Sequence, residues 1–120
     1  MTVSIEISEA INAFTTEVKA IVAGEAEQIA EDSADKLRIS SPKATGKYAK
    51  GWKHQVVRTP AGITAIVYNA SRPSLTHILE YGHMKRGGRG RVAAIPHIKK
   101  VEIEAAQEFE RRVVERIEKG

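Results

Sequence analysis

Residues 52–68 read WKHQVVRTPAGITAIVY. Apolar and polar side chains alternate in both halves of this stretch, residues 52–58 and 62–68, with the period of a β-strand. The tetrapeptide between them, residues 59–62, has proline in its second position, which is typical of a tight turn. The stretch therefore predicts an antiparallel β-hairpin over residues 51–69.

The region before the hairpin has the period of a helix instead. Strand-like alternation at residues 3–7 precedes it, and Ser8 is suited to cap a helix. We predict a long helix over residues 8–38, stopped by Pro42. Gly24 is its weak point, which we interpret as a bend or a close packing contact. Apolar residues recur along it every three or four positions: Ile11, Phe14, Val18, Ile21, Val22, Ile29, Ala30 and Leu37.

Three further segments follow the hairpin. Residues 75–81 predict a short helix that stops at Gly82. Residues 83–95 predict a basic, Gly/Arg-rich loop and a short strand. Pro96 is placed to begin a last helix over residues 97–118. The expected core positions of that helix step by four residues: Val101, Ala105, Phe109, Val113 and Ile117.

Together these segments predict one α+β domain over residues 1–120. The long N-terminal helix and the C-terminal helix are expected to pack on one face of a small antiparallel sheet, beside the basic loop. The chain has only six aromatic residues (one Trp, three Tyr and two Phe). We therefore expect part of the apolar stripe of the first helix to be covered by another subunit.

Composition excludes several classes of protein. With 42% hydrophobic and 28% charged residues, the chain is typical of a globular domain. No apolar run approaches the roughly 20 residues that cross a bilayer, and the first residues do not resemble a signal peptide, so we expect a protein that is neither membrane-spanning nor secreted. The absence of cysteine excludes thiolate chemistry and disulfide bonds.

Charge is distributed very unevenly along the chain. Residues 1–35 carry a net charge of −7, residues 36–100 carry +13, and residues 101–120 carry −2. A basic block between acidic ends suits a phosphate-rich partner, or docking of one subunit's basic surface on a neighbour's acidic one. The alternative is that opposite charges meet within one fold and cancel.

The order of motifs is similar to that of the HK-ninety-seven-type tail-component family of long-tailed phages. The similarity covers residues 8–117 and is carried by a long helix, SPKATGKY at residues 41–48, Trp52, a hairpin, LEYG at residues 79–82 and PHI at residues 96–98. The resemblance implies a neck or tail-completion protein of the virion, assembled in the host cytoplasm. It implies a homo-oligomeric ring, commonly a hexamer, that joins head connector to tail. The neighbours would be head-closure or connector proteins and tail-terminator or tail-tube proteins, with double-stranded DNA held without sequence preference in the lumen.

Most of the motif residues have a structural interpretation. Gly46 is free to take a positive backbone angle, Trp52 returns a large apolar face to the core, and Tyr81 is expected to be an aromatic anchor beside the helix stop at Gly82. The full structural set is Pro42, Thr45, Gly46, Trp52, Tyr81, Gly82, Pro96 and His97.

Two sets of charged residues are functional candidates. Bases in the Gly/Arg-rich loop are expected to contact channel DNA or a partner ring: Lys85, Arg86, Arg89 and Arg91. Acids on the first helix are expected to dock on basic residues of the next subunit: Glu25, Glu27 and Asp32.

Catalysis and metal binding are weakly supported alternatives. His77, Glu80 and His83 are spaced by three, and His97 could join them. However, Glu80 is the only acid between Lys36 and Lys100, and no serine has the setting of an activated nucleophile. We therefore predict no enzyme, no cofactor and no metal.

A free-standing nucleic-acid-binding module without sequence preference is the serious competitor. The basic block supports it, as do four aromatic residues that could stack on bases: Tyr48, Trp52, Tyr68 and Tyr81.

Overall fold

The fold is α+β, as predicted. It was obtained as a computed structural model, which describes residues 5–10, 15–42, 46–59, 62–84, 88 and 90–119. Among the described helices, none is long and apolar enough to cross a membrane. The elements in chain order are β1 (Ile5–Ala10), α1 (Thr16–Ser40), α2 (Lys47–Lys50), β2 (Trp52–Thr59), β3 (Gly62–Asn69), α3 (Pro73–Tyr81), β4 (His83–Met84), β5 (Arg91–Val92) and α4 (Ile98–Lys119).

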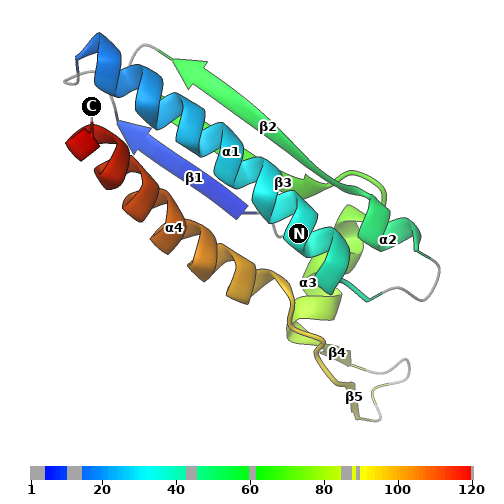
Figure 1. Cartoon of the computed structure of the whole chain (residues 1–120). Helices are drawn as coiled ribbons and strands as arrows, with labels where there is room; N and C mark the ends of the chain where they lie inside the picture. Colours follow the sequence, from blue (N-terminus) through cyan, green and yellow to red (C-terminus); the bar gives the residue numbers. More distant parts are fainter. Residues whose placement is uncertain are drawn as a thin grey trace.

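The predicted hairpin forms the centre and one edge of a three-stranded antiparallel sheet with the order β1-β3-β2. Its register places Trp52 opposite Asn69 and Thr59 opposite Gly62. Alternate residues of β3, Ile63, Ala65 and Val67, are buried. Helices α1 and α4 lie side by side over one face of this sheet (Figure 1), which gives the arrangement that the sequence predicts.

The start of the first helix was predicted wrongly. Ser8 lies opposite Thr64 within β1, and the helix begins at Thr16 rather than at Ser8. Thr15 is the true cap, because its hydroxyl accepts a hydrogen bond from the Val18 amide. The strand continues past Ile7 because pairing with β3 supplies its backbone hydrogen bonds. Of the predicted helix stripe, Ile11 and Phe14 lie outside the described residues.

Most of the described apolar stripe of α1 is covered within the chain, whereas Val18 and Ile21 are half-buried. Ala26, Ala30 and Ala34 are almost fully buried and follow one another at steps of four, between the larger buried residues Val22 and Leu37. Small side chains let a helix approach its neighbours closely. The stripe therefore packs against β2, β3 and α4 together.

The predicted core stripe of α4 turns out of the core along the helix. Val101 and Ala105 are buried, Phe109 and Val113 are half-buried, and Ile117 is 44% exposed. A helix advances about 100° per residue, so each step of four drifts about 40° around the axis. Four such steps carry Ile117 to the outer surface.

Two glycines give opposite predictions for the same substitution. Gly24 is exposed and a Cβ there would meet nothing within 4 Å, so the predicted close packing contact is absent. At Gly51 a Cβ would lie 2.6 Å from the Ser71 Cβ. Gly24→Ala should raise the free energy of unfolding by about 0.5–1 kcal/mol through helix propensity. Gly51→Ala should lower it by about 1–3 kcal/mol through overpacking.

Urea denaturation followed by circular dichroism measures both changes. A loss of stability in Gly24→Ala would show that α1 is bent or packed at this position.

Candidate functional site

The centre of the candidate site is a buried carboxylate in the last turn of α3. One oxygen of Glu80 accepts hydrogen bonds from the backbone N–H groups of His97 and Ile98, each at 2.8 Å. The other oxygen accepts from the Lys99 N–H at 2.9 Å. The first N–H groups of a helix have no partner within the helix. Glu80 therefore caps α4 from a different element.

This set of donors decides the charge of Glu80. Burial by itself would raise the pKa of the carboxyl, but hydrogen bonds from the three backbone N–H groups hold the pKa below its ordinary value. A carboxylate at a helix N-terminus also interacts favourably with the helix dipole. Both oxygens of Glu80 are thus committed to backbone amides, and among the described residues no cluster of His, Asp and Glu could hold a metal ion.

His97 joins the cap to the aromatic core. Its Nδ1 lies 2.8 Å from the Ile95 carbonyl, which can only accept, so Nδ1 carries the proton. Its Nε2 then accepts a hydrogen bond from the Tyr48 hydroxyl at 2.7 Å. Burial, helped by the nearby Glu80 charge, raises the pKa of Tyr48 well above its ordinary value. The phenol therefore remains a donor.

Trp52 completes this core. Its ring lies edge-on to Tyr48 at 5.7 Å between centroids and to His97 at 6.3 Å. Its indole N–H donates to the Ser41 hydroxyl at 2.8 Å, just after α1 ends. The segments that carry the family resemblance, far apart in the sequence, thus meet in one buried cluster. We call this cluster the junction: Ser41, Tyr48, Trp52, Glu80 and His97.

Other motif residues have mixed outcomes. Gly46 and Gly82 take positive φ angles of 79° and 74°, as helix-boundary glycines do. Tyr81 is 57% exposed, so the predicted aromatic anchor was wrong. Adjacent helix residues point about 100° apart, and the buried anchor is its neighbour Glu80. Pro42 follows α1 and Pro96 is an exposed residue before α4, whereas Thr45 lies outside the described residues.

Two short strands, β4 and β5, lie in the sequence between Glu80 and His97 of the junction. In this arm, residues 83–92, β4 pairs with β5, with Met84 opposite Arg91. Gly82 ends α3 on one side, and the Ile95 N–H donates to the Leu79 carbonyl on the other. Figure 1 shows β4 and β5 projecting from one end of the molecule.

The described surface of the arm and its base is apolar as well as basic. Arg91 is exposed, while Lys85, Arg86 and Arg89 lie outside the described residues. Three large apolar side chains are exposed here or at the base: Tyr81 at 57%, Met84 at 61% and Ile95 at 50%.

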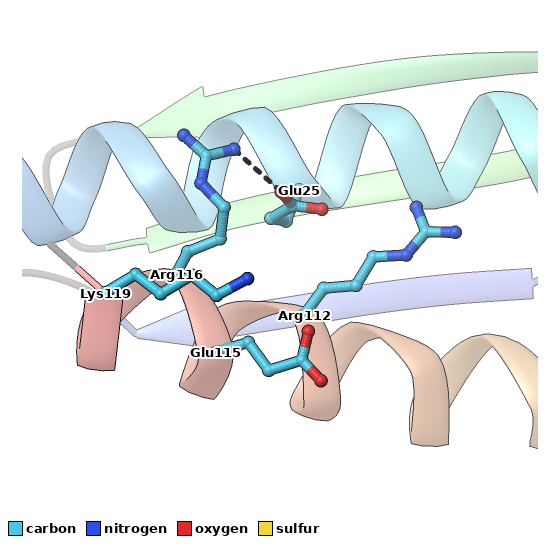
Figure 2. A pocket seen from close by; sticks show the side chains of 5 residues that line it. All are labelled: Glu25, Arg112, Glu115, Arg116 and Lys119. Carbon is cyan, nitrogen blue, oxygen red and sulfur yellow. Dashed lines mark hydrogen bonds and ion pairs between the residues drawn. The ribbon is translucent and has the colours of Figure 1, made fainter.

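The acids predicted to dock on a neighbouring subunit are paired within the chain. Glu25 contacts Arg116 at 2.8 Å and Asp32 contacts Arg112 at 3.1 Å, both across the seam between α1 and α4. Figure 2 shows the first pair beside a hollow of about 90 Å³. Glu27 pairs more loosely with Arg58, at 3.8 Å. The alternative in which opposite charges meet inside one fold therefore accounts for these acids.

Several described bases of the basic block have no such partner. Its bases without an ion-pair partner in the described part of the chain are Lys50, Lys53, Arg72, Arg91 and Lys100. The partners of Glu25 and Asp32 come from the C-terminal helix instead. Arg38 and Arg58 do pair with acids of α1, whereas these five described bases do not.

The stacking residues proposed for a nucleic-acid module are only partly accessible. Trp52 is fully buried and Tyr48 is 5% exposed, so neither can stack on a base. Tyr68 is half-buried, which leaves Tyr81 as the exposed member of the set.

No protein-family model, curated protein or solved structure matches the chain.

The cap predicts a pH-dependent contribution to stability. Because folding lowers the Glu80 pKa, its stabilisation is complete above the ordinary Glu pKa of about 4.3 and is lost as the pH falls through the folded value. Glu80→Gln should cost about 1–2 kcal/mol at pH 7. The difference between wild type and variant should shrink as the medium is acidified.

Thermal denaturation across this pH range measures that difference. Glu31→Gln, at an exposed position on α1, is the matched control and should change stability little. A constant difference at every pH would contradict a charged cap.

Proposed function

We propose that this chain is a non-enzymatic structural component of a long-tailed phage neck, a ring subunit that joins the head connector to the tail and surrounds the DNA channel. The observation that carries the proposal is the junction. The motifs that resemble the tail-component family contact one another in a single buried cluster, so they work together as one structural unit. Their shared task is to hold α3, α4 and the end of α1 in a fixed relation.

The junction also fixes where the arm leaves the body. The bond from Ile95 to Leu79 and the cap by Glu80 fasten the chain on the far side of the arm to α3. An arm rooted in this way can reach a neighbouring molecule without loss of the fold. This is what a subunit needs if it must join one ring to the next.

The exposed side chains favour a partner ring over DNA as the arm's principal contact. DNA phosphates bind Arg and Lys favourably, but they make no favourable contact with the apolar side chains of Tyr81, Met84 and Ile95. Protein interfaces combine aromatic residues, Met and Arg. We therefore assign the arm to docking on an adjacent ring protein. The unpaired bases of the middle segment are assigned to non-specific contact with DNA in the lumen.

Native mass spectrometry at two protein concentrations, with and without a short DNA duplex, tests the ring. The proposal predicts a closed oligomer, a hexamer if the family pattern holds, that forms without DNA. A monomer that binds the duplex tightly would contradict it and favour a free-standing nucleic-acid module.

Neutralising the arm should separate docking from folding. Replacing Lys85, Arg86, Arg89 and Arg91 with Ser should leave the melting temperature and the number of subunits in the ring unchanged but weaken ring joining. The control removes three exposed bases of the middle segment, Lys50, Lys53 and Arg72, and should weaken duplex retention while leaving ring joining unchanged. An arm variant that unfolds, or that behaves as the control does, would contradict the assigned role.

A further inference from the structure

Helix α4 carries a second apolar stripe on the face opposite its core contacts. Ile103, Val114 and Ile117 are 48%, 47% and 44% exposed. The buried side of the same helix is formed by Ile98, Val101 and Ala105. At about 100° per residue, the two sets lie roughly on opposite sides of the helix axis. One face of α4 packs in the core, and no described residue of the chain covers the other face.

The spacing of the outer stripe is that of a coiled coil. Starting at residue 100, the steps are three, four, three, four and three residues, which is a heptad seam of a and d positions. All of its members are exposed: Lys100, Ile103, Gln107, Glu110, Val114 and Ile117. Because this regular seam runs along most of α4, another helix is the partner that fits it.

The charged residues along the seam favour a second copy of α4 as the partner, in the antiparallel orientation. Lys100 lies at the N-terminal end of the seam, and Glu110 and Glu118 lie toward its C-terminal end. None of the three has an ion-pair partner among the described residues. A parallel copy of α4 would place like charges opposite each other. An antiparallel copy places Lys100 near Glu118 of the second copy and opposes the two helix dipoles.

We propose that the outer seam of α4 binds a second copy of this chain as an antiparallel helix pair. In the register that brings a positions opposite d positions, Ile103 meets Val114 of the second copy. Gln107 then meets Glu110 of the second copy and can donate a hydrogen bond to its carboxylate. A buried polar layer of this kind fixes the register of a helix pair.

Two-fold symmetry makes each of these contacts occur twice. This helix pair does not depend on the proposed ring. A two-fold contact does not close a ring, but joins two free subunits or two rings. Failure of one proposal therefore leaves the other standing.

The absence of native cysteine allows a direct test by disulfide cross-linking. Ile103→Cys and Val114→Cys are made as separate variants, mixed, and oxidised mildly. The antiparallel register predicts that the mixed disulfide forms in large excess over either homodisulfide. Lys53→Cys, at an exposed position on β2 and away from α4, is the control for random collision. A predominant Ile103→Cys homodisulfide, or cross-linking no greater than that of the control, would overturn the proposal.

A charge exchange tests the same register without oxidation. Lys100→Glu should raise the Kd of self-association at least about tenfold in sedimentation equilibrium. Adding Glu118→Lys should restore it, because the pair is re-formed with its signs reversed. Val57→Glu, at an exposed position on the sheet, should leave the Kd unchanged. Failure of the double variant to recover affinity would overturn the antiparallel arrangement.

Discussion

The carboxylate of Glu80, which accepts three backbone N–H groups at the start of α4, is the interaction on which the rest of the structure depends. It joins two helices that are separated in the sequence by the whole arm. The same helix start carries His97, which binds Tyr48 and packs beside Trp52. One buried charge thus fixes the direction of α4, the closure of the aromatic core and the root of the arm. Its burial is tolerated because amide donors surround it.

Some charged residues form ion pairs within the fold, and others have no ion-pair partner among the described residues. Acids of α1 meet arginines of α4 along the seam between the helices, at Glu25 with Arg116 and Asp32 with Arg112. These pairs hold two antiparallel helices in register. Five bases of the middle segment have no ion-pair partner among the described residues: Lys50, Lys53, Arg72, Arg91 and Lys100. The ion pairs therefore hold α1 against α4, and these five bases remain exposed.

Local patterns were predictable from the sequence, and contacts between distant segments were not. The hairpin and the last helix depend on short-range periodicity, so both appear where their spacing predicts them. The first helix begins at Thr16 because β1 pairs with β3, more than fifty residues later, and no local signal reports that pairing. Glu80 was noted as the sole acid of a basic segment, but its partners lie 17 to 19 residues further along. The exposure of Ile117 follows from the drift of a four-residue step and could have been calculated.

The most direct test of this account is an NMR pH titration that follows the Glu80 side-chain carboxyl carbon together with the amide protons of His97, Ile98 and Lys99. The account predicts that the carboxyl titrates below the usual range for Glu, and that all three amides shift with the same midpoint. A carboxyl that titrates at its ordinary pKa, with amides that do not respond, would show that Glu80 does not hold α4 in place.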